Sequence, residues 1–155
     1  MQDASVHKAK AYVYRLLNIR LRSEQEIRDR LIRRAYLPDC VERVIQYFSE
    51  LRLIDDYEFS CQWATCRFVR HYGIQRVKYE LIQKGIAKEV IDTVLAQTYD
   101  AQKEGEVIRA LLSKCLLKYS ISDLPKNKRR VYDYLKRRGF NTNTINRVFD
   151  QYDWK

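Results

Sequence analysis

Apolar residues recur along the chain at intervals of three and four positions, which is the spacing of one face of an α-helix. One such pattern occurs three times, at residues 23–48, 73–98 and 127–152. In each copy an apolar pair four residues apart precedes a basic, a small and a bulky apolar residue, and a second apolar trio follows. A helical repeat of about 50 residues is typical of stacked arrays, whose units bury their apolar faces against one another. Such arrays present long surfaces, so the pattern favours a binding protein.

The three copies align position by position. Val77 follows Ile27 by 50 residues, and Val131 follows Val77 by 54 residues. In the second and third copies the small residue is glycine, which suits the left-handed position just after a helix. The aligned residues are Ile27, Leu31, Arg34, Ala35 and Tyr36 in the first copy, Val77, Leu81, Lys84, Gly85 and Ile86 in the second, and Val131, Leu135, Arg138, Gly139 and Phe140 in the third.

The pattern predicts an all-α fold built as three tandem three-helix repeats, at residues 1–54, 55–100 and 101–155. No alternating strand pattern competes with this interpretation. The nine expected helices cover residues 6–21, 23–35, 40–51, 57–71, 74–84, 88–99, 104–116, 128–138 and 144–152, with an irregular stretch at 119–128.

Several helix starts carry recognisable caps. Ser23 and Glu26 form the Ser-x-x-Glu pattern of a capping box, in which each side chain bonds the backbone N–H of the other residue. Thr142 or Asn143 is expected to cap the last helix. The chain ends in a short tail, which Trp154 is expected to tuck against the last repeat.

Candidate catalytic chemistry is sparse. The sequence contains no glycine-rich phosphate loop, no His-Glu-x-x-His and no Gly-x-Ser-x-Gly. Asp55 and Asp56 form an adjacent acidic pair, but acid–base or metal chemistry would need further converging carboxylates, so helix capping is the favoured interpretation. The four cysteines include no Cys-x-x-Cys pair and are expected to be reduced, partly buried thiols. We therefore expect no catalytic residue, no metal and no cofactor.

The positive charge is uneven along the chain. The formal net charge is +10, and by repeat it is +4 over residues 1–54, −1 over 55–100 and +7 over 101–155. Such a balance indicates an acidic partner, either nucleic acid or an acidic protein surface, although a solvated basic surface is the plain alternative. No apolar run reaches the roughly 18 residues of a membrane span, and the first residues show no secretory signal, so the expected compartment is the cytoplasm.

Seven basic residues crowd into positions 126 to 138, and two more occupy the aligned helix end of the first copy. Cations at a helix C-terminus also gain from the helix dipole, which is the alternative explanation for Arg34, Lys84 and Arg138. Because like charges at this density repel one another, we expect a phosphate or acidic-surface contact. The candidate partner-binding residues are Lys126, Lys128, Arg129, Arg130, Lys136, Arg137, Arg138, Arg33 and Arg34, with Tyr72, Tyr132 and Tyr134 as candidate base-stacking platforms.

Three segments together resemble the bacterial RecX regulatory proteins. They are Leu53-Ile-Asp-Asp-Tyr-Glu-Phe59, Tyr72-Gly-Ile-Gln-Arg-Val-Lys-Tyr-Glu-Leu-Ile-Gln-Lys-Gly-Ile86 and Tyr134-Leu-Lys-Arg-Arg-Gly-Phe140. They are similar to the family's Leu-Asp-Asp-x-x-Phe, Tyr-Gly-Pro-x-x-Ile-x-x-Glu-Leu-x-x-Lys-Gly-Ile and Leu-x-x-Arg-Gly-Phe patterns. The resemblance spans about residues 10–150, and Ile74 departs from it where the family usually has proline.

The resemblance implies a modulator of the RecA recombinase in DNA recombination, DNA repair and the SOS response. Family members are elongated, curved arrays of three helical repeats that bind RecA and RecA–DNA filaments and mostly suppress ATPase, strand-exchange and co-protease activity. A monomer without a catalytic site is expected, and direct contact with single- or double-stranded DNA stays open. The alternative is a DNA-binding protein that acts without RecA.

Overall fold

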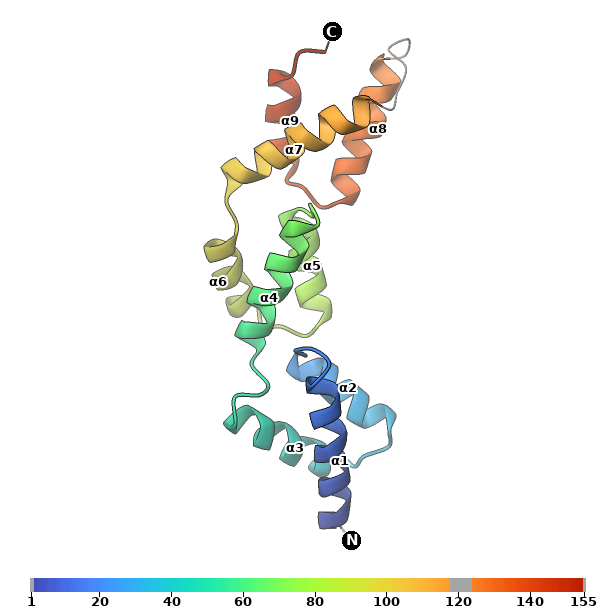
Figure 1. Cartoon of the computed structure of the whole chain (residues 1–155), viewed down its shortest axis with the longest axis vertical. Coiled ribbons are helices and arrows are strands. Elements are labelled where there is room, and N and C mark those ends of the chain that lie inside the picture. Colours follow the sequence, from blue (N-terminus) through green and yellow to red (C-terminus); the bar gives the residue numbers. More distant parts are fainter. Residues whose placement is uncertain (1, 118–123, 155) are drawn as a thin grey trace. The chain divides into compact units, whose positions relative to one another are not determined.

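The computed structural model describes residues 2–117 and 124–154. Within these residues there are nine helices and no strand, arranged as three successive groups of three (Figure 1). The prediction of an all-α fold with three three-helix repeats is therefore confirmed. The helices are α1 (Gln2–Leu17), α2 (Glu24–Arg33), α3 (Pro38–Glu50), α4 (Asp56–Val69), α5 (Ile74–Gln83), α6 (Lys88–Thr98), α7 (Ala101–Leu116), α8 (Leu124–Arg137) and α9 (Thr142–Gln151).

The chain divides into two compact units that cut across the second repeat. The first unit combines Met1–Gln62 with Leu81–Val94, and the second combines Trp63–Glu80 with Leu95–Lys155. Each unit therefore contains one whole repeat and part of the middle one.

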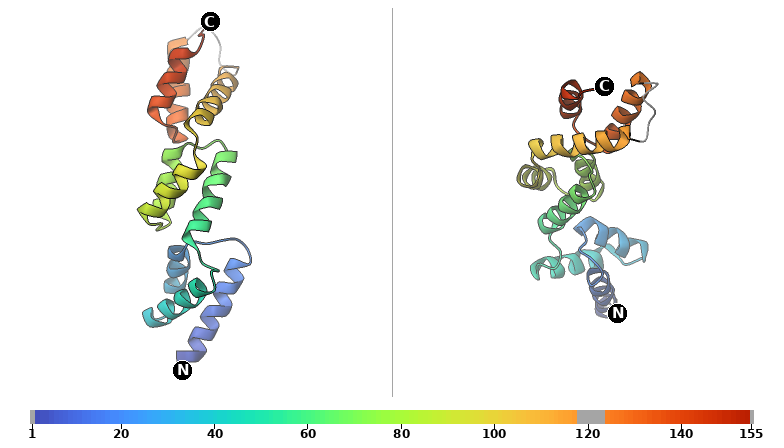
Figure 2. Two further views of the ribbon diagram at one scale, coloured as in Figure 1. Left: turned by 90° about the vertical axis from the view of Figure 1, so that its left-hand side faces the viewer. Right: turned by 45° about the horizontal axis from the view of Figure 1, so that its top comes forward.

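In the first unit, α3 packs against both α1 and α2 (Figures 1 and 2). The apolar stripes predicted from the sequence supply the contact, because every third or fourth residue of each helix points inward. Phe48 is fully buried at the centre, and Tyr14 and Tyr47 meet its ring edge-on at 4.7 and 5.2 Å between ring centroids. The buried residues are Val6, Ala9, Val13, Leu16, Ile27, Leu31, Cys40, Val41, Val44, Ile45, Phe48 and Ile54.

Helix α1 begins and ends four residues earlier than expected. Its buried stripe runs through Ala9, Val13 and Leu16, and the next position of that stripe is the polar Arg20. Ile19, which falls within the predicted helix at 6–21, is 75% exposed. The helix therefore ends at Leu17, where its buried face runs out.

One turn recurs at the end of the second helix of every repeat. Ala35, Gly85 and Gly139 have positive φ angles of 59°, 75° and 83°. In each case the next residue donates its backbone N–H to a carbonyl five residues earlier, which is the Schellman arrangement that closes a helix end. The three bonds are Tyr36 to Leu31 at 3.3 Å, Ile86 to Leu81 at 3.2 Å and Phe140 to Leu135 at 3.3 Å.

Two of the cap predictions need correction. Ser23 does accept the N–H of Glu26 at 3.2 Å, but Glu26 does not complete a capping box, because its carboxylate bonds Arg20 and Lys84 instead. Helix α9 is capped by Asn141, whose side chain accepts the N–H of Asn143 at 2.9 Å, and not by Thr142 or Asn143 as expected.

In the second unit, α7 packs against α8 and α9 (Figure 2). Helix α7 starts at Ala101, three residues before the predicted start, because Asp100 caps it by accepting the N–H of Gln102 at 2.8 Å. Helix α8 extends back to Leu124, and the rest of the irregular stretch expected before it lies outside the described residues. The indole of Trp154 donates to the Phe149 carbonyl at 2.9 Å, which confirms the tucked tail.

Candidate partner interface

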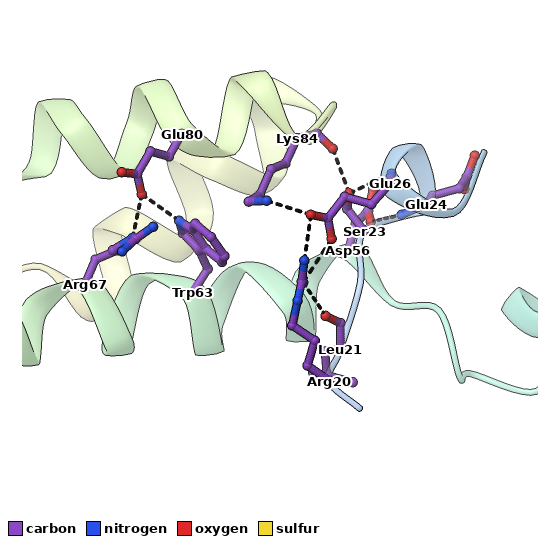
Figure 3. Close-up of polar contacts among 10 residues, drawn as sticks. All are labelled: Arg20, Leu21, Ser23, Glu24, Glu26, Asp56, Trp63, Arg67, Glu80 and Lys84. Atoms are coloured by element: carbon purple, nitrogen blue, oxygen red, sulfur yellow. Dashed lines mark hydrogen bonds and ion pairs between the residues drawn. The ribbon is translucent and has the colours of Figure 1, made fainter. Parts of the chain in front are cut away.

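The first compact unit contains a docking point between the start of α2 and the end of α5. The hydroxyl of Ser23 donates to the Lys84 carbonyl at 2.8 Å, and the Lys84 ammonium donates to Glu26 at 2.7 Å (Figure 3). Gly85 lies against Gln25, and a Cβ added to this glycine would lie 2.5 Å from the Cβ of Gln25. A side chain at position 85 would therefore push the two helix ends apart.

The aspartate pair belongs to the same region. Asp55 accepts the N–H groups of Tyr57 and Glu58 at 2.9 and 3.0 Å, and so caps α4. Asp56 accepts the N–H of Glu24 at 2.9 Å, and so caps α2 from the neighbouring repeat (Figure 3). Burial raises the pKa of Asp56, against the opposing effect of the Glu24 backbone bond. Both residues thus serve as caps, as predicted.

The second compact unit repeats the docking point with the start of α5 and the end of α8. The Gly73 N–H donates to the Arg138 carbonyl at 2.8 Å, and the Gln75 N–H donates to the Gly139 carbonyl at 2.9 Å. A Cβ on Gly139 would lie 2.4 Å from the backbone nitrogen of Arg76. Gly85 and Gly139 therefore combine a left-handed conformation with a close neighbour, which is the Gln25 side chain for Gly85 and the Arg76 backbone for Gly139, and glycine satisfies both requirements.

Arg138, a predicted partner-binding residue, is committed to this second docking point. Its guanidinium donates to the carbonyls of Arg70 and His71 at 2.7 Å each. It also lies over the rings of Tyr72 and Tyr134, at 4.9 and 5.3 Å from the ring centroids. The side chain is therefore half-buried and holds α8 to the turn after α4, which was not expected from its place in a basic run.

Two more of the predicted cations stack on aromatic rings. Arg34 lies 4.0 Å from the centroid of the Tyr12 ring in the first unit, and Lys128 lies 4.3 Å from the Trp154 ring in the second. Such contacts stabilise the cation by about 0.5–1 kcal/mol at exposed sites. Tyr132 packs edge-on against Phe149, so this predicted stacking platform is already occupied.

The other predicted residues are exposed. Arg33 is exposed at the end of α2 in the first unit. The remaining predicted residues lie in the second unit, along the outer face of α8. Val131 and Leu135, on the inner face of α8, are buried. These exposed α8 residues are Lys126, Arg129, Arg130, Lys136 and Arg137.

A hollow of about 430 Å³ lies beside the end of α8, between it and α5. Lys136 and Arg137 line it from α8, and Arg76 and Tyr79 line it from α5. Tyr79 is 63% exposed, so its ring faces solvent rather than the core. The hollow thus combines three cations with an accessible aromatic ring. Sequence reasoning missed Tyr79 and Arg76, although both fall on the face of α5 opposite Val77 and Leu81.

Glu80 holds the α5 side of this hollow in place. Its carboxylate accepts from the Trp63 indole at 3.0 Å and from Arg67 at 2.6 Å (Figure 3). Its other oxygen accepts from Arg76 at 3.0 Å. Because Glu80 is 16% exposed and bonds three donors, it fixes the position of Arg76 at the rim.

The described residues hold no group of three metal-ligating side chains, and no helix among them is long and apolar enough to span a membrane. None of the four cysteines forms a disulfide: Cys40 is buried, Cys61 and Cys115 are half-buried, and Cys66 is exposed. The prediction of partly buried thiols is therefore wrong for Cys66.

Three family models match the chain in succession. They describe the first, second and third three-helix domains of RecX, and they match residues 9–48, 55–95 and 103–149. The chain belongs to the RecX family. The resemblance noted in the sequence is thereby confirmed.

Relatives and solved structures of the RecX family agree with this assignment. The chain is 29% identical to the regulatory protein RecX of Prosthecochloris aestuarii over 97% of both chains. It is 33% identical to the regulatory protein RecX of Mycolicibacterium smegmatis, over 86% of this chain and 73% of the relative. The crystal structure of RecX from Lactobacillus salivarius matches 96% of this chain and 97% of that chain with a TM-score of 0.85 at 21% identity, which shows a shared fold.

Proposed function

We propose that this protein binds the RecA recombinase and RecA–DNA filaments, and lowers their ATPase, strand-exchange and co-protease activities. The observation that carries the proposal is membership of the RecX family through all three repeats. The protein would act as a cytoplasmic monomer in DNA repair and the SOS response, without catalysis or a cofactor. The three repeats that carry out this function would be residues 1–54, 55–100 and 101–155.

The outer face of α8 and the adjoining hollow are the proposed binding surface. This surface contains several exposed cations, and electrostatic attraction to an acidic partner raises the rate of encounter. Lys136, Arg137 and Arg76 line the same hollow as the accessible ring of Tyr79. Arg138 and Lys128 contribute less to it, because their side chains already stack or bond within the chain.

The first experiment measures the RecA ATPase on single-stranded DNA while this protein is added. We expect inhibition that saturates with concentration. Unchanged ATPase activity, together with no binding to RecA-coated DNA, would reject the proposed function.

A second experiment locates the surface. The double change Lys136→Ala and Arg137→Ala removes two exposed cations from α8, and the control Lys8→Ala and Arg15→Ala removes two exposed cations from α1. We expect the α8 pair to weaken filament binding by about tenfold, or about 1.4 kcal/mol, and the control to have a smaller effect. Equal losses would show that the partner responds to net charge alone.

Direct DNA binding without RecA is the second candidate function. An exposed tyrosine among cations suits stacking on a base beside phosphate contacts, which favours single-stranded nucleic acid. Salt-sensitive binding to single-stranded DNA that leaves RecA activity unchanged would support this candidate over the first. Loss of DNA binding in Tyr79→Ala, with retention in Tyr57→Ala, would place the contact at the hollow.

A further inference from the structure

The second compact unit contains a separate cavity of about 450 Å³. It lies among α4, α7 and the turn after α8, away from the exposed face of α8. A cavity of this size can receive a large side chain or a small ligand. Its wall contains several aromatic rings and the carboxyl groups of Glu104 and, at the rim, Asp100; the other residues that matter here are Phe68, Tyr72, Tyr99, Val107 and Phe140.

Glu104 is the unusual member of this wall, because its side chain carries a carboxyl group at only 5% exposure. The Tyr99 hydroxyl donates to its Oε1 at 2.8 Å, and the Asn141 N–H donates to the same oxygen at 3.1 Å. The Tyr99 hydroxyl in turn accepts the N–H of Ile74 at 2.9 Å. These bonds hold the carboxyl group in one orientation and join the second repeat to the third.

The second oxygen of Glu104 has a different environment. Among the described residues, both hydrogen bonds of Glu104 fall on Oε1, so Oε2 has no protein donor. Oε2 is nevertheless not sealed from solvent, since Arg22 Nε is the one fully enclosed polar side-chain atom without a partner in the described part of the chain. An occupant that excluded solvent from this carboxylate oxygen without donating to it would leave it unpaired in an apolar surrounding, which is costly. The site therefore selects an occupant that brings a donor.

The rest of the wall indicates which donor. Phe68, Val107 and Phe140 give the wall apolar surface, which packs against the aliphatic stem of a long basic side chain. The exposed charges of Asp100 and Lys103 at the rim offset one another, which leaves Glu104 as the buried charge. We propose that this cavity receives an arginine or lysine side chain of a protein partner, with its charged end at Glu104 Oε2. That the partner is RecA rests on the proposed function.

A probe titration tests the cavity without RecA. The probe is N-acetyl-arginine N-methylamide, with the norleucine analogue as its uncharged counterpart, and the signal is the NMR shift of the Val107 methyl groups. We expect saturable shifts with the arginine probe and binding about tenfold weaker with the norleucine probe or in Glu104→Gln. No saturable shift, or equal affinity in all three cases, would overturn the proposal.

A second variant keeps the test decisive if Glu104→Gln fails to fold. Val69 lines the cavity and is 75% exposed, so Val69→Trp can fill the cavity from its rim without disturbing the Glu104 bonds. Ile19→Trp is the matched control, because Ile19 is also 75% exposed but lies outside the cavity. We expect Val69→Trp to abolish the probe shifts and the control to retain them. Probe binding that survives Val69→Trp would contradict the assigned site.

Binding to RecA–DNA filaments then tests the partner. Val69→Trp is expected to weaken filament binding at least tenfold relative to Ile19→Trp, and equal binding would overturn the partner role of the cavity. If the unmodified protein bound no filaments at all, the proposed function would fail. The probe titration alone would still decide whether the cavity binds a cationic side chain.

Discussion

Glu26 is expected to stabilise the first unit in a pH-dependent way. Its carboxylate accepts from Arg20 at 3.0 Å and from Lys84 at 2.7 Å, and so joins the segment after α1 to α2 and to the end of α5 (Figure 3). Burial opposes the charged form, but the two cations prevail and lower the pKa of Glu26 from 4.5 to about 2. The stabilisation should therefore be complete above pH 4.5 and be lost as the pH falls toward 2.

The magnitude follows from that pKa difference. Each pKa unit corresponds to about 1.4 kcal/mol between the folded and unfolded states, which gives about 3 kcal/mol at neutral pH. Arg20 is 42% exposed, and solvent screens its share, so we expect about 2–3 kcal/mol. Glu26→Gln should lower the free energy of unfolding by that amount at pH 7.

Urea denaturation of the wild type and Glu26→Gln, from pH 7 down to pH 3, measures this contribution. The difference between the two proteins should shrink steadily below pH 4.5. The exposed Glu106 on α7 provides the control, and Glu106→Gln should change stability by less than about 0.5 kcal/mol at every pH. A Glu26→Gln difference that is constant with pH, or no larger than the control, would refute the reasoning.

Three further predictions concern the docking points and the basic surface. Gly139→Ala should lower stability by at least about 1–2 kcal/mol, because φ is +83° and the new Cβ would lie 2.4 Å from a backbone nitrogen. Gly105→Ala should instead raise stability by about 0.5–1 kcal/mol, because this glycine is helical and the nearest atom to a new Cβ would lie 3.9 Å away. Urea denaturation should show these opposite signs. Arg138→Ala should lower the melting temperature, because the Arg138 guanidinium donates to two backbone carbonyls. Arg137→Ala should leave the melting temperature unchanged and weaken filament binding. Thermal melts and binding titrations on both variants separate the two effects. Affinity for RecA–DNA filaments should fall between low and physiological salt, and a flat salt dependence would argue against an electrostatic surface.

The sequence predicted the helices well because their information is local. The apolar spacing of α2, α5 and α8 identified their buried residues, and Leu31, Leu81 and Leu135 are all fully buried. The positive φ of Gly85 and Gly139 also followed from residue type. Such features need only the periodicity of a helix and the chemistry of its end.

The partners of the charged side chains could not be predicted in the same way. Ser23 bonds the carbonyl of Lys84, which lies 61 residues further along the chain, and Arg138 bonds a carbonyl 68 residues before it. The capping-box pattern at Ser23 was misleading for a related reason: Glu26 had cations within reach that only the folded repeat brings close. A local pattern indicates what a side chain can do, and the tertiary fold decides among its partners.

The repeat itself shows which basic residues are available for a partner. At the last position of α2, α5 and α8 the chain has Arg33, Gln83 and Arg137, and all three are exposed. At the following position it has Arg34, Lys84 and Arg138, and each contacts another side chain or a backbone carbonyl in its own unit. Because the same turn follows in every repeat, the side chain at the last helical position projects outward. The side chain at the following position turns back toward its own unit. The outward position is basic in the first and third repeats and neutral in the second, so we expect an acidic partner to contact Arg33 and Arg137 at this position.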